Sequence, residues 1–431
     1  MMRTILQLRY FLPAMVGGIL LYAGTATGGA LVYDSRATST ASKIPEVATT
    51  TVANVEPIIP VFVVTHIAPP QQVRAAYMTS CIASTPKLRA TLTKLVEKTE
   101  LNAIIIDIKD YTGMISFDVE DPRFTLNSKG CHIPDIKEYI AELHKKKIYV
   151  IGRVTVMQDS VYPKAHPDAA VKRKSDGGIW KDKKGLMFID PGASDYWEYM
   201  VALGKASYAV GFDEINYDYI RFPSDGDMSN IKFTHTGTTS KPVMMKKFYS
   251  YLGGAMHKAG IPISADLFGM TTTNTDDLNI GQILEDALLH FDYVAPMVYP
   301  SHYPPGFNGW KDPNAVPYEI IKFAMSRAVK RADELEKKIS GYKSVIIGAD
   351  GATSTAPAFV PKGIYSKKLR PWIQDFDYGK VYTEADVRAQ KKAVYDSGLN
   401  SWMSWDPSNK YTPSAYNSAE TSLPTATSTG A

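Results

Sequence analysis

Residues 211–223 read GFDEINYDYIRFP, an apolar run that a polar residue interrupts at every second position from Glu214 to Asp218. Because successive side chains of a β-strand point to opposite faces, Glu214, Asn216 and Asp218 share one face. The intervening apolar and aromatic residues share the other face, which is suited to pack under helices. The polar face then points into a barrel, with Asp218 nearest to the carboxyl end of the strand.

Short apolar runs alternate with longer helical patterns on both sides of this stretch. Eight strands are predicted, at residues 73–79, 103–109, 147–156, 211–222, 262–269, 293–299, 369–376 and 401–405. Helices are predicted between them, at residues 86–99, 135–146, 195–210, 242–259, 280–290, 318–338 and 384–397. This arithmetic is typical of a (β/α)8 (TIM) barrel. A doubly wound open sheet is the alternative, and the lack of a Gly-rich phosphate loop after the first strand counts against it.

One segment does not fit the simple repeat. Residues 341–368 contain SVIIGAD and then a stretch rich in Pro, Gly, Ser and Thr. The segment is either an extra strand with its loop or the seventh strand itself. We predict an insertion before the seventh strand.

The composition narrows the class of protein. The chain has 431 residues, of which 45% are hydrophobic and 21% charged, and these values exclude a wholly disordered, fibrous or multi-span membrane protein. The net charge is only +4, and the basic runs at 144–147 and 172–174 are typical of a solvated surface, so we expect no nucleic-acid partner. Aromatic residues reach 11%. Such a surplus suits a flat polar ligand such as a carbohydrate, although core packing accounts for much of it.

The two ends of the chain differ from its middle. Arg3 and Arg9 precede an uncharged stretch at 10–33, which is long enough to cross a bilayer as an anchor or to serve as a cleaved signal peptide. Either alternative predicts an exported chain, with membrane contact through this segment. We divide the chain into a signal peptide or anchor, a Thr/Ala/Ser/Pro-rich linker, the barrel domain and a disordered tail, at residues 1–33, 34–70, 71–411 and 412–431.

A pair of carboxylates is the strongest candidate for chemistry. The fifth strand reads PISADLFGM (262–270), and its alternation places Asp266 near the same end of the barrel as Asp218. Glycoside hydrolysis requires two carboxyl groups, one as acid and one as nucleophile or base. The alternatives are structural: Asp218 pairs with Arg221, or Asp266 caps a helix or orders a loop.

Further polar residues interrupt the neighbouring strands. Asp107 and Lys109 share a face of the second strand, and Arg153 interrupts the third. An internal ion-pair network of these three residues is the plainer interpretation, and the binding of sugar hydroxyls is the functional one. Asn216 and Arg221 are candidates for substrate binding on the fourth strand.

The carboxyl ends of the last three strands carry aromatic and polar residues. The candidates for substrate binding there are Tyr299, His302, Trp372, Gln374, Asp375, Trp405 and Asp406. Aromatic faces that stack on sugar rings would explain the clustering. Asp375 is the reserve candidate for the general acid.

Two cysteines, Cys81 and Cys131, follow the first and second strands, whose loops meet at the same end of a barrel. A disulfide is geometrically plausible, and two independent buried thiols are the alternative. No GxSxG, HExxH or Walker motif is present, so we expect neither a cofactor nor a metal.

Several runs, taken in order, resemble a known family. They are IIIDIKDYTG (104–113), YVIGRVTV (149–156), GFDEINYDYIRFP (211–223), DYVAPMVYPSHYPPG (292–306), PNAVPY (313–318), LRPWIQDF (369–376) and WMSWDPSN (402–409). The set is similar to the "putative glycosyl hydrolase domain" of bacterial proteins and covers residues 73–411. The resemblance implies a TIM barrel and a carbohydrate substrate, without firm catalytic assignments.

A more distant resemblance bears on the roles. GFDEINYDY looks like the fourth-strand pattern of the alpha-amylase-like barrels, which implies that Asp218 takes the nucleophile position. This chain departs from that pattern in two places, with Asn216 where those barrels carry Arg and Asp266 where they use Glu.

We therefore predict an exported glycoside hydrolase that acts on an extracytoplasmic poly- or oligosaccharide. Asp218 is the predicted nucleophile or base and Asp266 the general acid. A non-catalytic, carbohydrate-binding barrel at the cell surface is the alternative. A metal-dependent deacetylase is disfavoured because the 8 His residues show no ligand spacing. The oligomeric state stays open.

Overall fold

A computed structural model of the chain describes residues 62–127, 131–343, 345–347 and 353–419. Residues Val64–Ala431 form one compact unit, distinct from Met1–Val63, and the fold below belongs to the former. The predicted signal segment and nearly all of the predicted linker lie outside the described residues, as does the end of the predicted tail.

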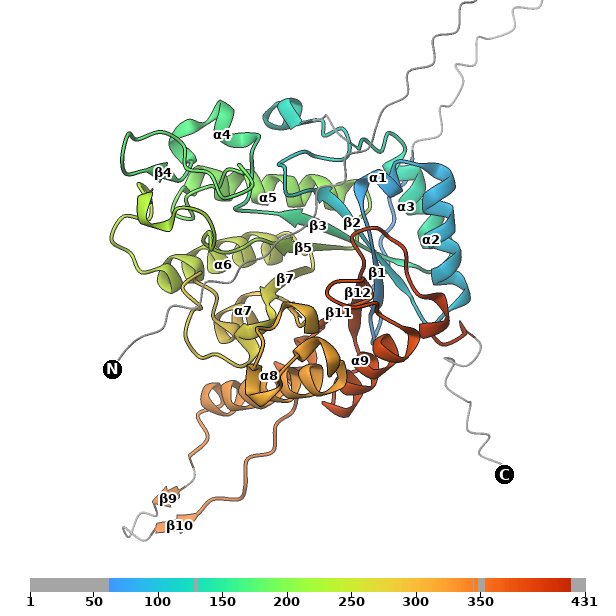
Figure 1. The fold of residues 1–431 in the computed structure, drawn as a ribbon, viewed down its shortest axis with the longest axis vertical. Coiled ribbons are helices and arrows are strands. Elements are labelled where there is room, and N and C mark those ends of the chain that lie inside the picture. Colours follow the sequence, from blue (N-terminus) through green and yellow to red (C-terminus); the bar gives the residue numbers. More distant parts are fainter. Residues whose placement is uncertain (1–61, 128–130, 344, 348–352, 420–431) are drawn as a thin grey trace, which may run out of the picture. The chain divides into compact units, whose positions relative to one another are not determined.

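The centre of the compact unit is a closed barrel of parallel strands, so the predicted TIM barrel is confirmed and the open sheet is wrong (Figure 1). The strands close in the order β1-β12-β11-β8-β7-β5-β3-β2. Their bounds are β1 Arg74–Met78, β2 Ala103–Lys109, β3 Tyr149–Thr155, β5 Glu214–Asp218, β7 Ile263–Phe268, β8 Tyr293–Met297, β11 Trp372–Gln374 and β12 Trp402–Trp405.

Helices connect consecutive strands and cover the outside of the barrel. The long ones are α2 Pro86–Lys98, α3 Ile136–Lys145, α5 Ser194–Ala209, α6 Lys241–Lys258, α7 Leu284–His290, α8 Pro317–Ile339 and α9 Glu384–Asp396, and α1 Ser80–Ala83 and α4 Tyr162–Ala165 are short. Local signals set several ends. Thr383 and Asp386 form a capping box at the start of α9, and Gly398 takes a φ of 84° just after its end, as helix stops favour.

Loops at the two ends of the barrel carry the remaining elements. Two short antiparallel pairs are β4 Lys172–Arg173 with β6 Ile231–Lys232, and β9 Val345–Ile347 with β10 Thr353–Thr355. The second pair lies between α8 and β11, so the segment 341–368 is the predicted insertion before the seventh barrel strand. Short 3₁₀ helices occupy Pro122–Asn127, Pro167–Ala169, Met228–Asn230, Gly269–Thr272, Pro300–His302, Phe307–Gly309, Pro313–Ala315, Ser366–Lys368 and Pro413–Ala415.

The alternation of side chains along the strands produces two hydrophobic clusters. The inner cluster fills the barrel and includes Ala75, Ile105 and Trp372. The outer cluster, with Ile104 and Tyr217 among its members, packs between the strands and the helices. Since the inner cluster ends below the strand ends, polar side chains at the carboxyl end of the barrel can face one another.

The loops after β1 and β2 are joined by a disulfide. Cys81 in α1 bonds to Cys131, with 4.5 Å between their Cα atoms. Across residues 62–419, apart from the gaps at 128–130, 344 and 348–352, no helix combines the length and apolar character that a bilayer span needs. The stretch 10–33 lies outside this range.

Candidate active site

Asp218 and Asp266 lie on neighbouring strands and face the inside of the barrel. Asp218 ends β5, and the register that pairs Asn216 with Ser264 leads to Asp218 beside Asp266 on β7. Both carboxylates are nearly inaccessible, with 4% and 1% of their surface exposed. Burial of two adjacent carboxylates is costly unless other groups balance their charge.

The guanidinium of Arg153, from β3, supplies that balance. Its Nη1 donates to Asp107 Oδ1 at 2.7 Å and its Nη2 donates to Asp218 Oδ2 at 2.5 Å. Its Nε lies 3.8 Å from Asp266 Oδ2, beyond hydrogen-bond distance. The Tyr77 hydroxyl donates to the second oxygen of Asp107 at 2.5 Å. One cation is therefore shared unequally among three carboxylates.

Asp266 is held by neutral donors instead. The indole Nε1 of Trp372 donates to its Oδ1 at 2.8 Å, and Asn216 Nδ2 donates to the same oxygen at 2.9 Å. Burial raises the pKa of Asp266 well above its usual range, and the negative charge of Asp218 raises it further, while Arg153 and the two donors oppose the rise. The pair is thus arranged to favour a proton on Asp266, beside the carboxylate that Arg153 binds.

The backbone fixes the second oxygen of Asp218. The N–H of Tyr219 donates to Asp218 Oδ1 at 2.6 Å. Tyr219 has a φ of 52°, in the left-handed region that non-glycine residues seldom adopt. The strand ends at this turn, and the turn aims a backbone donor at the carboxylate. Backbone strain of this kind concentrates at functional sites.

An aromatic wall, made of Tyr77, Tyr299, Trp372 and Trp405, surrounds this cluster. Trp405 stacks on Tyr77 with 3.8 Å between ring centroids. The Trp372 ring is nearly perpendicular to the Trp405 ring, with 5.4 Å between their centroids. Arg153 lies 5.0 Å from the Trp405 ring centre. Trp405 is only partly buried, so it is the member of the wall that a ligand can reach most directly.

Lys109 does not join the network in which we predicted it. Its Nζ bonds to Asp159 Oδ2 at 2.9 Å and to the Thr155 carbonyl at 2.7 Å, and the side chain is fully buried. The pairing of β2 with β3 shifts register between Asp107 and Lys109. This irregularity breaks the two-residue alternation, so only Asp107 and Arg153 of the predicted network contact each other.

Arg221 does not pair with Asp218, contrary to the structural alternative. Its Nη1 donates to the Phe222 carbonyl at 3.0 Å and to Ser224 Oγ at 3.2 Å. The guanidinium also lies over the Phe268 ring, 4.7 Å from its centre. The chain turns away from the barrel after Asp218, and this turn carries Arg221 away from the carboxylate.

Asp375 and Asp406 form hydrogen bonds with the segment that follows β12 rather than with the carboxylate pair. Asp375 Oδ2 accepts hydrogen bonds from Tyr416 Oη at 2.7 Å and from the Thr412 N–H at 2.9 Å. Asp406 Oδ1 accepts one from the Ser408 N–H at 2.5 Å. Trp372 points into the barrel, so Asp375, three residues further, faces outward. Both aspartates order the segment that follows β12.

Gln374 and His302 connect two rim loops. Gln374 Oε1 accepts from Ser301 Oγ at 2.8 Å, and its Nε2 donates to the Phe376 carbonyl at 2.9 Å. The His302 ring lies 5.4 Å from that of Tyr299. Burial lowers the pKa of His302 to about 4, so the imidazole is neutral near pH 7 and unsuited to donate a proton.

The sequence analysis missed Tyr77 and Asp159. Tyr77 is two residues after Ala75 on an inward-facing register of β1, and this parity is the signal that could have identified it. Asp159 lies in a loop with no periodicity to mark it. Among the residues that the structure describes, no three His, Cys, Asp or Glu side chains gather in a way that could hold a metal ion.

Two solved structures are similar to this chain. A hypothetical protein from Ruminiclostridium thermocellum is 29% identical over 48% of this chain and 98% of its own, with a TM-score of 0.40. The PgaB (BpsB) glycoside hydrolase domain from Bordetella bronchiseptica is 12% identical over 79% of this chain and 95% of its own, with a TM-score of 0.52, and supports the barrel fold. No curated protein matches the chain.

The family model described as "Putative glycosyl hydrolase domain" matches residues 75–344 and 351–411. These ranges contain all eight barrel strands except the first residue of β1, and they contain the carboxylate pair. The predicted family and the predicted enzyme class, a glycoside hydrolase, agree with that description. The chain belongs to this glycosyl hydrolase domain family.

Proposed function

We propose that the barrel hydrolyses a glycosidic bond with Asp266 as general acid and Asp218 as nucleophile. The observation that carries the proposal is the unequal sharing of Arg153, which bonds to Asp218 but not to Asp266. The raised pKa of Asp266 adds to this arrangement, because it favours a proton on the carboxyl group that Arg153 does not bind by a hydrogen bond. Glycoside hydrolysis of this kind requires one protonated and one ionised carboxyl group.

The geometry favours a retaining mechanism. Neighbouring strands lie about 4.8 Å apart. The pairing of Tyr217 with Ala265, carried on by one residue, would bring Asp218 and Asp266 to the same step of adjacent strands. Retaining enzymes separate the two groups by about 5–5.5 Å, whereas inverting enzymes need about 6.5–9.5 Å to admit a water. Asp266 would protonate the departing oxygen while Asp218 attacks the anomeric carbon. Asp266 would then deprotonate the water that releases the sugar.

The aromatic wall supports a carbohydrate substrate. Sugar rings present apolar C–H faces that stack on aromatic rings, and Trp405, the partly buried member of the wall, lies beside Arg153. We place the substrate outside the cytoplasm, since the basic residues before the stretch 10–33 favour export of the rest of the chain. An extracytoplasmic poly- or oligosaccharide is therefore the proposed substrate class.

Release of reducing ends from a panel of cell-wall and storage glycans tests the reaction. The native protein is expected to release them, while Asp218→Asn and Asp266→Asn lose the activity by at least about a hundredfold. Asp225→Asn, in a loop after β5, is the matched control and keeps it. Equal activity of all four proteins would remove the assignment.

Chemical rescue tests the mechanism separately. In a retaining enzyme, azide replaces the missing nucleophile of Asp218→Gly and gives a glycosyl azide. If the native protein is active but azide restores nothing to Asp218→Gly, and the first product has the inverted anomeric configuration, Asp218 acts as a base for water instead.

A glycan-binding module without hydrolysis is the second candidate. It is favoured because the charged groups of the cluster already bind one another: Arg153 bonds to both Asp107 and Asp218. Retention of the native protein and of Asp218→Asn on one glycan, with no reducing ends released by either, would support it.

A further inference from the structure

The insertion between α8 and β11 concentrates positive charge. Residues 337–368 contain six lysines and a single aspartate. Five of these lysines are exposed: Lys337, Lys338, Lys343, Lys362 and Lys367. Two exposed acidic side chains of the described residues lie nearby, and both already face lysines: Glu334 faces Lys330 on the same helix, and Asp396 faces Lys392. The segment is thus strongly basic in a chain whose net charge is only +4.

Exposed aliphatic side chains lie among these lysines. Ile339 is 52% exposed, Val345 48%, Val360 79% and Ile364 55%. Grouped exposure of this kind is unusual on a free surface and marks a contact site. We call the five lysines and these four residues the basic arm.

The two limbs of the basic arm are tied to each other. The Tyr342 ring lies 5.4 Å from that of Phe359, and the Tyr342 hydroxyl donates to the Pro357 carbonyl. The Glu336 carboxylate in α8 accepts hydrogen bonds from the N–H groups of Lys362 at 2.7 Å and Ile364 at 2.8 Å. These contacts fix the root of the insertion to the end of α8.

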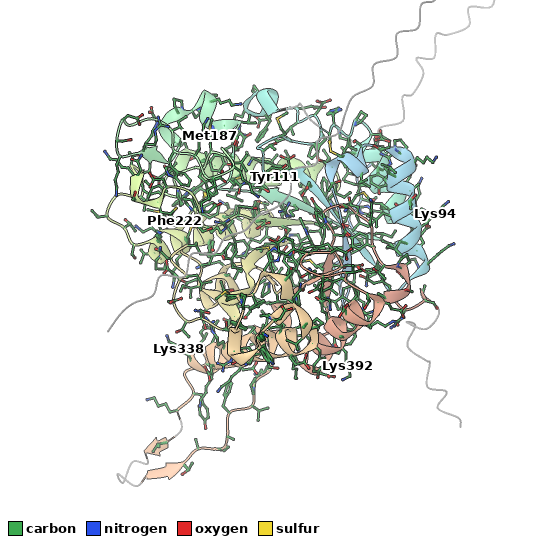
Figure 2. The ribbon with its side chains drawn as sticks, in the orientation of Figure 1. Lys94, Tyr111, Met187, Phe222, Lys338 and Lys392 are labelled. Carbon is green, nitrogen blue, oxygen red and sulfur yellow. A yellow bond between two sulfur atoms is a disulfide. The ribbon has the colours of Figure 1, made fainter. Side chains whose placement is uncertain are left out.

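The basic arm lies at the end of the barrel opposite to the candidate active site. It joins the C-terminal end of α8 to β11, and in a parallel barrel such connections meet the amino ends of the strands. Figure 1 shows the β9–β10 hairpin leaving the barrel beyond α8, and Figure 2 shows Lys338 beside its root. The chain also enters at this end, where the Ile67 N–H donates to Asp213, just before β5.

We propose that the basic arm docks on an anionic lipid bilayer. Its lysines complement the phosphate headgroups, and its aliphatic side chains enter the boundary between headgroups and acyl chains. The aliphatic residues favour a lipid bilayer over a soluble polyanion, because a polyanion offers them no apolar contact. Docking of this end would turn the carboxyl ends of the strands away from the membrane. The proposal stands whether or not the barrel hydrolyses a glycan.

The test places an environment-sensitive fluorophore on the full chain. The two native cysteines are in a disulfide, so Val345→Cys supplies the single free thiol. Val243→Cys, which is exposed to the same 48% at the other end of the barrel, is the matched control. In vesicles with phosphatidylglycerol, emission from position 345 is expected to shift to the blue, and it is not expected to shift in phosphatidylcholine alone. Position 243 is expected to stay unchanged in both.

Charge variants separate the basic arm from the rest of the surface. Lys338→Gln, Lys343→Gln and Lys362→Gln together are expected to weaken docking by about a hundredfold, since each lysine near an anionic surface contributes about fivefold. The same change at Lys87, Lys94 and Lys98 of α2 leaves the shift intact, since α2 lies on the far side of the barrel from the β9–β10 hairpin (Figure 1).

Three results would overturn the proposal. They are no shift at position 345 with phosphatidylglycerol, an equal shift at position 243, and a shift that both triple variants retain. If polyglutamate without vesicles produces the same shift, the partner is a soluble polyanion and the lipid assignment fails.

Discussion

The replacement Asp266→Asn is expected to stabilise the protein at neutral pH while it abolishes the proposed activity. Well below the unfolded pKa of Asp, about 3.9, the Asp266 carboxyl is protonated in both the folded and the unfolded chain. Above that pKa the unfolded chain loses the proton and the folded chain keeps it, since burial and Asp218 raise the pKa of Asp266. The native protein therefore loses stability as the pH rises toward the folded pKa.

The size of this loss follows from linkage. It amounts to about 1.4 kcal/mol for each pH unit between the unfolded and the folded pKa, or about 2.7 kcal/mol over two units. An Asn side chain does not titrate, has the shape of the protonated acid, and can accept from Trp372 and Asn216 through its carbonyl oxygen. Its amide nitrogen near Arg153 adds an offset that does not depend on pH. The difference between variant and native protein is expected to grow from pH 4 upward and then level off.

Urea unfolding followed by tryptophan fluorescence at pH 4, 5, 6 and 7 measures this difference. Asp159→Asn is the contrasting control, because it removes the charge that faces Lys109 at 2.9 Å. Breaking such a buried pair costs about 3–5 kcal/mol, so that variant is expected to be less stable throughout. The reasoning is refuted if the free energy of unfolding of Asp266→Asn differs from that of the native protein by a constant amount at all four pH values. It is also refuted if Asp266→Asn becomes less stable relative to the native protein as the pH rises.

Three more outcomes are expected. Arg153→Met leaves buried carboxylates unpaired and should lower the free energy of unfolding by about 3–5 kcal/mol, as calorimetry would detect; a loss below 1 kcal/mol contradicts the shared ion pair. Reduction of the disulfide between Cys81 and Cys131, 50 residues apart, should cost about 4 kcal/mol in a denaturant titration with and without reductant, whereas coincident curves would count against it. Because the pKa of His302 is about 4 when folded, the free energy of unfolding of the native protein should fall by about 3 kcal/mol as the pH falls from 6.5 to 4. His302→Phe should not show this fall, and equal falls in both proteins would disprove the prediction.

The elements of the barrel could be predicted from the sequence because their signals are local. The second strand was expected at 103–109 and is β2, Ala103–Lys109. The last helix was expected at 384–397 and is α9, Glu384–Asp396, which starts at a capping box. Alternation also placed Asn216, Asp218 and Asp266 inside the barrel, since residues two apart in a regular strand share a face.

The site was predictable only as far as that regularity extends. Lys109 follows an irregularity in the β2–β3 pairing, so counting by twos assigned it to the wrong contacts. Asp375 follows the last residue of β11, and its orientation depends on Tyr416, 41 residues further along the chain. Arg221 was a natural partner for Asp218 by distance in sequence. The strand that adjoins β5 supplied Arg153 instead, and only the barrel order reveals that neighbour.

The roles of the two carboxylates depend on a residue that neither of their strands contains. Asp218 and Asp266 occupy equivalent steps of β5 and β7, and by strand pattern alone either is a candidate for the acid. Arg153 removes the symmetry, because β3 adjoins β5 and not β7, so its guanidinium reaches Asp218 at 2.5 Å and stays 3.8 Å from Asp266. Asp107 holds a second nitrogen of the same guanidinium, which limits the rotation that would bring the cation to Asp266. The proton therefore stays on the carboxyl group that is one strand further from the arginine.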